Sequence, residues 1–225
     1  MARATGKKSA KAGRTSRDQI LDGAEKVFSE KGYYGSTTRD IAEQSRVHLG
    51  LLGYYFPTKL DLYHAVITRR AEEYSNAIRE SLRRARGGGE WTTVPVADLI
   101  QALFRPIAEL SLNGGPGWKN YIRLLARAAN TRRTEPYVQT FMETFNPVSL
   151  ELIEILGKRF PDAAPEDIYW SQSFLAGAIN HALIETEAID RYSDGLCRSS
   201  DLETVLAKLG PFFAAGMIRL AQGES

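Results

Sequence analysis

The stretch from Thr37 to Lys59 gathers side chains that can bind nucleic acid. The hydroxyls of Thr37 and Tyr54 and the ammonium of Lys59 can donate hydrogen bonds to phosphate oxygens, which fix the position of a protein on a duplex. Between them, side chains such as His48 and Leu49 suit contacts with base edges, which carry the sequence information. The residues that we expect to contact double-stranded DNA are Arg14, Arg17, Thr37, Thr38, Arg39, His48, Leu49, Gly50, Gly53, Tyr54 and Lys59.

The same stretch predicts two short helices joined by a tight turn. Thr37 is a good N-cap, and Asp40 lies three residues on, near the positive end of the first helix. The second predicted helix runs from His48 to Tyr55 and ends before Pro57, because the residue before a proline avoids helical dihedral angles. A helix this short must be held by packing. This is the layout of a helix-turn-helix, whose second helix enters the major groove of DNA.

The ladder T-T-x-x-I-A, followed by Val47, Gly50 and the run Y-F-P-T-K, resembles the tetracycline-repressor (TetR) family of bacterial regulators. The resemblance covers roughly residues 16–62. Two positions depart from the family pattern: the glycine usual in the turn is Arg46, and the aromatic residue usual shortly before the F-P pair is Gly53. The resemblance implies a palindromic DNA operator, a homodimer and a second domain that binds a small inducer.

Composition limits the other possibilities. The chain has 225 residues, a hydrophobic fraction of 43% and a net charge of +2, which are ordinary values for a soluble globular protein. It contains no run of about eighteen apolar residues, so no membrane span is expected. The basic N-terminus lacks the apolar segment of a secretory signal. Cys197 is the single cysteine, which excludes an internal disulfide and a cysteine zinc cluster. We expect a cytoplasmic protein with no cofactor and no metal.

Residues 1–15 form a basic segment of low complexity. Six cations precede the first acid, Asp18, and they are Arg3, Lys7, Lys8, Lys11, Arg14 and Arg17. Such a segment is either a solvated, flexible arm or an arm that binds nucleic acid. Its position directly before a helix-turn-helix favours the second interpretation.

The hydrophobic spacing predicts an all-α fold: a flexible basic arm (1–15), an N-terminal three-helix helix-turn-helix DNA-binding domain (16–58) and a C-terminal helical ligand-binding and dimerisation bundle (59–225). We expect Ser16 and Gln19 to form the capping box of the first helix. One long helix, from Thr58 to about Arg86, is expected to link the two domains. The further expected helices are Pro95 to Leu112, Trp118 to Asn130, Pro136 to Phe160 with a kink or break at Pro147, Glu166 to Ile189, and a last helix capped by Asp201.

Aromatic side chains are frequent in the middle helices. Each alone suits a plain core; as a set beside a DNA-binding domain they suggest an apolar ligand cavity, because ligand pockets are lined mainly by apolar and aromatic side chains. His181 is either a satisfied core histidine or an orienting hydrogen-bond partner for a ligand. The predicted ligand-binding residues are Phe104, Trp118, Tyr121, Leu125, Phe141, Phe145, Trp170, Phe174 and His181.

The last two long helices are apolar over more than one stripe, whereas a helix on a monomer surface shows one apolar face. Both are therefore core helices, or they also pair with their copies in a twofold dimer. The resemblance implies the second interpretation. The predicted dimer-interface residues are Gly177, Phe212, Phe213, Gly216 and Met217.

No sequence motif indicates catalysis. The three histidines lie in separate elements, and no metal-ligand, nucleophile or phosphate-loop motif is present. We therefore expect a DNA-binding transcriptional regulator, namely a repressor released by a small apolar inducer. Two alternatives are open: a ligand-independent activator or architectural DNA-binding protein, and a helical lipid carrier or enzyme.

Overall fold

The computed structural model describes residues 15–223, and within that range the regular elements are helices, as the sequence predicts. The elements in chain order are α1 (Ser16–Lys31), α2 (Thr38–Ser45), α3 (Leu49–Tyr55), α4 (Lys59–Thr68), α5 (Ala71–Arg86), η1 (Trp91–Thr93), α6 (Val96–Asn113), α7 (Trp118–Ala129), η2 (Pro136–Val138), α8 (Gln139–Arg159), α9 (Pro165–Ile184), α10 (Ala188–Tyr192) and α11 (Leu202–Ala221). Residues 1–14 of the basic arm, Arg14 among them, lie outside the described residues.

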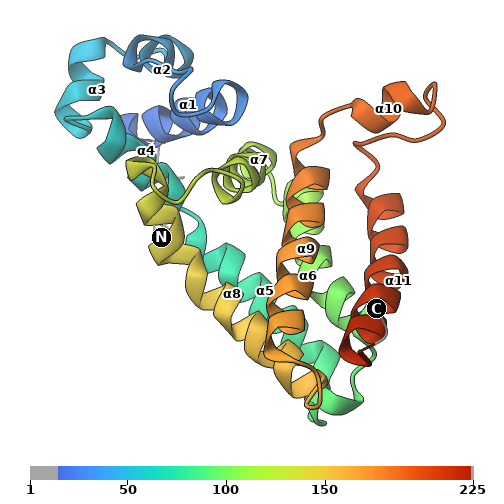
Figure 1. The fold of residues 1–225 in the computed structure, drawn as a ribbon. Helices are drawn as coiled ribbons and strands as arrows, with labels where there is room; N and C mark the ends of the chain where they lie inside the picture. Colours follow the sequence, from blue (N-terminus) through green and yellow to red (C-terminus); the bar gives the residue numbers. More distant parts are fainter. Residues whose placement is uncertain (1–14, 224–225) are drawn as a thin grey trace, which may run out of the picture.

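Helices α1–α3 form a small head at one corner of the molecule (Figure 1). Capping boxes begin α1 and α2, in which Thr15 pairs with Asp18 and Thr37 with Asp40. The prediction that Ser16 and Gln19 would cap α1 was wrong by one residue. At Gly23, α1 and α2 approach so closely that an added Cβ would lie 2.0 Å from the hydroxyl of Ser45, so only glycine fits there.

The sequence predicts one long helix from Thr58 to about Arg86, but the structure has two helices in this range. α4 ends at Thr68, and α5 begins at Ala71 after Arg70, whose dihedral angles (φ −119°, ψ 9°) are not helical. No glycine or proline marks this break. The side chains of Arg69 and Arg70, at the break, extend back to α1 and bind its carboxylates. Tertiary contacts, rather than a helix-breaking residue, therefore accompany the break. α4 packs against α1 and also against α7, α8 and η2.

The C-terminal part contains α5–α11. α8 is one continuous helix with Pro147 inside it, which selects one of the two predicted possibilities. α9 ends at Ile184 rather than Ile189, because Glu185 adopts a left-handed conformation (φ 52°). α9 and α11 contact each other and stand at the side of the molecule away from the head (Figure 1).

Candidate nucleic-acid interface and ligand cavity

The recognition helix α3 presents most of its side chains to solvent. Tyr54 is 80% exposed and Leu49 is 45% exposed, whereas Leu52 is buried and anchors the helix on the head. His48 is the N-cap residue of α3, and its exposed side chain makes no capping hydrogen bond. The side chain of His48 is thus free for a base edge.

The other predicted contact residues of the head are also accessible. Gly50 and Gly53 are exposed, and nothing lies within 4 Å of a Cβ added at either position. Thr38 and Arg39 lie in the first turn of α2, where Arg39 is exposed and Thr38 is partly buried. A phosphate or base can approach the backbone of α3 closely at both glycines.

Two predicted phosphate ligands already have partners inside the protein. The Thr37 hydroxyl accepts from the backbone N–H of Asp40 (3.1 Å) and donates to its carboxylate (2.7 Å). The Lys59 Nζ donates to the carbonyls of Tyr33 (2.8 Å) and Ser36 (2.9 Å). Burial lowers the pKa of the Lys59 ammonium. Lys59 therefore holds the connection between α1 and α2, which sequence reasoning missed.

Two arginines border the recognition helix. Arg46, in the turn before α3, is exposed and adopts the left-handed conformation (φ 54°), which explains why glycine suits this position. The guanidinium of Arg17 lies 5.3 Å from the centre of the Phe56 ring. Both side chains add positive charge beside the surface that the sequence predicts to contact DNA.

A cavity of about 310 Å³ lies among helices α5–α9. Its wall contains three of the predicted ligand-binding residues, namely Leu125, Phe141 and Phe145. The residues that line it are Tyr74, Ile78, Leu103, Ile107, Ile122, Leu125, Ala126, Ala129, Asn130, Arg133, Phe141, Phe145, Asn146, Val148, Ser149, Leu152, Gln172, Ser173, Ala176, Gly177, Ile179, Asn180 and Leu183. Most of these were missed because they are ordinary aliphatic or small polar residues in the sequence.

Six predicted ligand-binding residues do not line this cavity. Phe104, Trp118 and Tyr121 are fully buried in the closed core, where the Tyr121 hydroxyl donates to the carbonyl of Ile67 (2.6 Å). The other three, Trp170, Phe174 and His181, are exposed on α9. His181 is therefore not the buried core histidine of the first interpretation, and it does not line this cavity.

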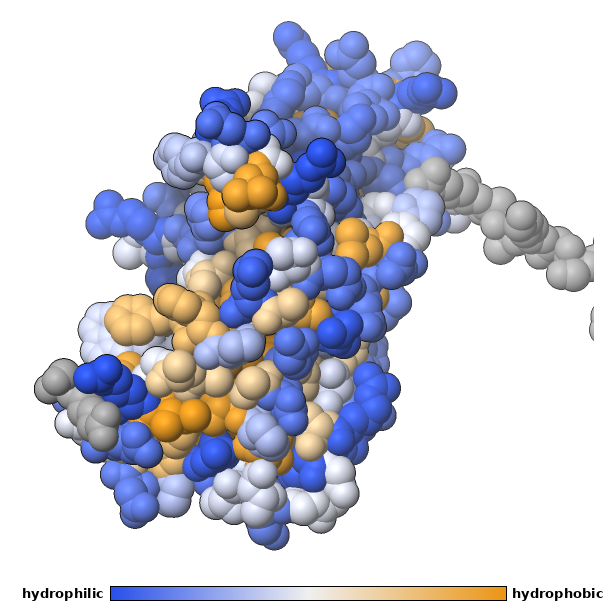
Figure 2. All heavy atoms as spheres, turned by 90° about the vertical axis from the view of Figure 1, so that its right-hand side faces the viewer, coloured by the Kyte–Doolittle hydropathy of each residue, from blue (hydrophilic) through white to orange (hydrophobic). Residues whose placement is uncertain are grey.

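A second, open groove runs between α9 and α11, and apolar residues gather over part of this side of the molecule, with hydrophilic residues around them (Figure 2). Four predicted dimer residues line it together with Phe174, and they are Phe212, Phe213, Gly216 and Met217. Phe212 is 75% exposed, whereas Met217 is 3% exposed and belongs mainly to the core. Gly177 lies on the cavity wall instead. α11 is long and apolar enough to cross a membrane by length and composition, a criterion that the apolar helix of an interface also meets.

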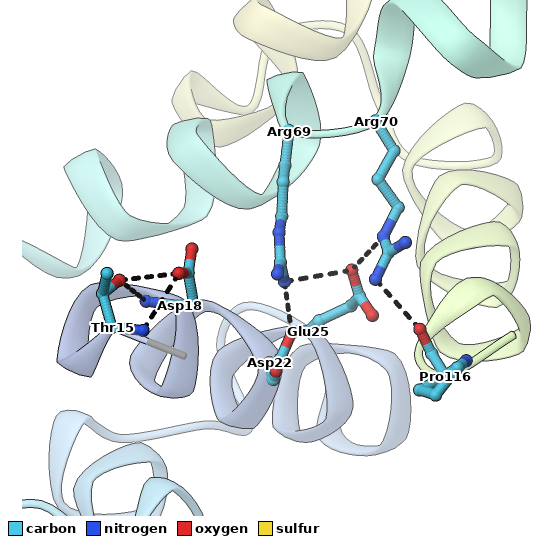
Figure 3. A network of polar contacts seen from close by, with 7 residues as sticks. All are labelled: Thr15, Asp18, Asp22, Glu25, Arg69, Arg70 and Pro116. Atoms are coloured by element: carbon cyan, nitrogen blue, oxygen red, sulfur yellow. Dashed lines mark hydrogen bonds and ion pairs between the residues drawn. The ribbon is translucent and has the colours of Figure 1, made fainter. Parts of the chain in front are cut away.

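A network of charged groups joins the head to the C-terminal part (Figure 3). Arg70 donates from Nε to the carboxylate of Glu25 (3.1 Å) and from Nη2 to the carbonyl of Pro116 (3.1 Å). Arg69 donates to Asp22 (2.5 Å). Glu25 is completely buried, and this burial raises the pKa of its carboxyl in spite of the arginines. The network therefore links α1, the α4–α5 break and the loop before α7.

A cluster of tyrosines makes a second link. The ring of Tyr137, in η2, stacks on Tyr33 with ring centres 4.4 Å apart and meets the edges of Tyr34 and Tyr63. The Tyr34 hydroxyl donates to the Glu135 carboxylate (2.5 Å), which raises the pKa of Tyr34 to about 12. The segment that carries both Glu135 and Tyr137 follows Asn130 and Arg133 of the cavity wall. The head thus touches the segment that borders the cavity.

Within residues 15–223, no three histidine, cysteine or acidic side chains lie close enough together to hold a metal ion. The geometry is that of a helix-turn-helix head on a helical domain with a partly open cavity. This combination defines a DNA-binding regulator.

Comparison with known proteins agrees with this class. Residues 20–66 match the family described as bacterial regulatory proteins, tetR family, and residues 101–216 match the Tetracyclin repressor-like, C-terminal domain. The chain belongs to the TetR family of transcriptional regulators.

The curated relatives match over part of their length. The transcriptional activator FasR of Mycolicibacterium smegmatis is 34% identical over 30% of this chain and 31% of its own. The negative regulator IcaR of the Staphylococcus aureus biofilm operon is 28% identical over 51% of this chain and 54% of its own. This chain thus matches about half or less of each relative. A tetR-family structure from Rhodococcus RHA1 has the same fold, with a TM-score of 0.62, 15% identity and coverage of 89% of this chain and 96% of that one.

Proposed function

We propose that this protein is a cytoplasmic transcriptional repressor that binds a palindromic operator as a homodimer and leaves it when a small, largely apolar inducer fills the cavity. The observation that carries the proposal is the pair of links that joins the head, which bears the exposed recognition helix, to two segments beside the cavity: α7 with its preceding loop, and the stretch from Glu135 to Tyr137. Residues 16–58 would bind DNA, and residues 59–225 would bind the inducer and the second subunit. The proposal includes no catalytic step.

Response to a ligand is supported by the position of the cavity. α7 contributes Ile122, Leu125 and Ala126 to the cavity wall and also packs against α1 of the head. On the other side, the cavity reaches the segment before η2. Tyr137 of η2 packs on Tyr33 and Tyr63. A ligand that favours one arrangement of these elements also changes the position of the head. By linkage, DNA must then weaken ligand binding by the same factor by which the ligand weakens DNA binding.

Homodimer formation is supported by the apolar side of α9 and α11. Trp170 and Phe174 stack on each other on the outside of α9, and Phe212 projects from α11. Large contiguous apolar patches on soluble proteins mark interaction sites. A twofold partner would cover this surface and place two recognition helices on successive turns of DNA.

The relatives regulate transcription in both directions, since FasR is an activator and IcaR a negative regulator. The test is selection of DNA sites with the purified protein, followed by transcription in vitro from a promoter that contains the selected site. Reduced transcription supports a repressor, and increased transcription favours the activator alternative. Absence of any sequence-specific site would contradict DNA-binding regulation and favour the carrier alternative.

A further inference from the structure

We infer that the cavity takes an amphipathic carboxylate, that is, a ligand with an apolar body and one negatively charged end held by Arg133. This inference rests on the proposed function, in which the cavity is the ligand site, and it names the chemical class of that ligand. Three features of the cavity wall support it: aromatic and aliphatic residues, uncharged polar residues and a single charge.

The apolar residues of the cavity wall suit a hydrocarbon or aromatic body. Phe141 and Phe145 lie with ring centres 5.1 Å apart, and Tyr74 meets the Phe145 ring edge-on at 5.5 Å. Ile78 and Leu125, both buried, complete this part of the wall. Burial of apolar surface here stabilises a bound ligand by about 25 cal/mol per Å² before the costs of association are subtracted.

The polar part of the wall can hydrogen-bond to a ligand. Its residues are Asn130, Asn146, Ser149, Gln172, Ser173 and Asn180. The amide of Asn130 donates to the carbonyl of Ala126 (2.9 Å), which leaves its own oxygen available. The side chains of Asn146, Gln172 and Asn180 have no hydrogen bond with any residue of the range 15–223. These amides are donors that suit a carboxylate oxygen.

Arg133 supplies the only charge among the described residues of the wall. Arg133 is an exposed residue, and its guanidinium lies 5.9 Å from the centre of the Phe141 ring, so the cation lies beside the aromatic part of the wall. No carboxylate of the described chain forms an ion pair with it. A guanidinium binds a carboxylate through two parallel hydrogen bonds. One cation and no anion on the wall favour a ligand with one negative charge and disfavour a cationic ligand.

The test uses the full chain and four probes of equal chain length or similar shape: decanoate, decanamide, decanol and decyltrimethylammonium. Binding is measured by isothermal titration calorimetry below the concentration at which the probes form micelles. We expect decanoate to bind most tightly and the cationic probe most weakly. Arg133→Gln should weaken decanoate binding by roughly ten- to a hundred-fold, since it removes a charge-assisted contact, and should leave decanamide binding unchanged. Arg132→Gln is the matched control, because Arg132 and Arg133 are neighbouring exposed arginines and only Arg133 is on the wall.

Three results would overturn the inference: equal affinity for decanoate and decanamide, no binding of decanoate, or decanoate affinity that survives Arg133→Gln. Ala129→Phe, which fills part of the cavity, should weaken both probes and so shows that they bind there. Operator affinity measured with saturating decanoate separates this inference from the proposed function. If decanoate binds through Arg133 and operator affinity stays the same, the ligand class stands and the ligand-controlled regulation fails.

Discussion

The Nε atom of Arg70 lies 3.1 Å from a carboxylate oxygen of Glu25, across the boundary between the DNA-binding head and the rest of the molecule (Figure 3). The other oxygen of Glu25 makes no hydrogen bond within the described chain. It lies so close to Gly117 that a Cβ added to this glycine would be only 2.3 Å from it. The guanidinium of Arg70 also lies 5.1 Å from the Trp118 ring centre. This ion pair therefore depends on three segments that are far apart in the sequence.

Replacement of Arg70 is expected to destabilise the protein strongly. Arg70→Met should lower the free energy of unfolding by about 3 kcal/mol, because it leaves the buried Glu25 carboxylate without its nearest cation. Denaturant unfolding monitored by circular dichroism measures this loss. The double variant Glu25→Gln with Arg70→Met should recover part of it. A double variant no more stable than Arg70→Met would contradict the view that the uncompensated charge is the cause.

The same pair predicts a dependence of stability on pH. Burial raises the pKa of Glu25 above its ordinary value of 4.5, so the folded state binds this proton more tightly than the unfolded state does. The resulting stabilisation is fully present below that ordinary value and is lost as the pH rises through the raised pKa. The stability of the wild type relative to Glu25→Gln should therefore increase when the pH is lowered from neutral toward 4.5. A difference that is constant over this range would show that Glu25 does not titrate there.

Arg46, in the turn before the recognition helix, adopts the left-handed backbone conformation, which lowers the stability of the fold. A residue with a side chain in the left-handed conformation costs roughly 1 kcal/mol relative to glycine. Arg46→Gly should therefore raise the free energy of unfolding by about that amount. If the guanidinium also contacts a phosphate, Arg46→Gly and Arg46→Ala should both reduce the slope of log affinity against log salt by about 0.9 for each subunit of the bound dimer. Arg46→Ala keeps the strained conformation, so only Arg46→Gly should gain stability.

The recognition helix supports a prediction about two kinds of contact. Tyr54→Phe should weaken binding to all DNA sequences alike, because it removes a hydroxyl that we expect to contact phosphate. His48→Ala should change the preferred base at one position of each half-site, by roughly 1–3 kcal/mol. Both side chains are exposed, so neither change should unfold the head. Selection of sites from a random DNA library with each variant is the measurement, and identical site preferences for wild type and His48→Ala would exclude base contact by His48.

Sequence patterns between residues a few positions apart predicted the helices of the head well, but they identified few of the residues that line the cavity. The capping box of Thr37 and Asp40 involves residues three positions apart, so the sequence contains all of it. The break at Arg69 and Arg70 depends on Asp22 and Glu25, whose approach is a tertiary event. In the same way, hydrophobicity identified Trp170 as an apolar residue of α9, but not which side of that helix faces the core.

The groove between α9 and α11 yields a prediction about assembly. Phe212→Glu should convert the proposed dimer to a monomer that binds the operator weakly, because it places a charge in an apolar interface that should bury roughly 2,000 Å² or more. Phe212 suits this test better than Met217, which is buried within the protomer. Leu150→Glu on α8 is the control, since Leu150 is 63% exposed and does not line the groove. A dimer that persists in Phe212→Glu during sedimentation would place the interface elsewhere.

The hydrogen bond between Tyr34 and Glu135 should transmit ligand binding to the head. Tyr34→Phe removes the hydroxyl that donates to Glu135 but keeps the ring that meets Tyr33 and Tyr137. In the wild type, a cavity ligand should change operator affinity by about 1–3 kcal/mol, the usual size of such a coupling. In Tyr34→Phe, the ligand and the operator should each bind nearly as in the wild type, while the coupling between them becomes smaller.

The measurement of this coupling is operator affinity with and without saturating ligand, and ligand affinity with and without operator. Reciprocity requires the two ratios to agree within each variant, which checks the titrations. Tyr192→Phe on α10 is the control, because Tyr192 is 88% exposed and has no contact with the tyrosine cluster. If Tyr34→Phe kept the full coupling, transmission would have to run through the other link, from α7 through Trp118 and Arg70 to Glu25. Glu25→Gln would then be the variant in which the coupling is lost.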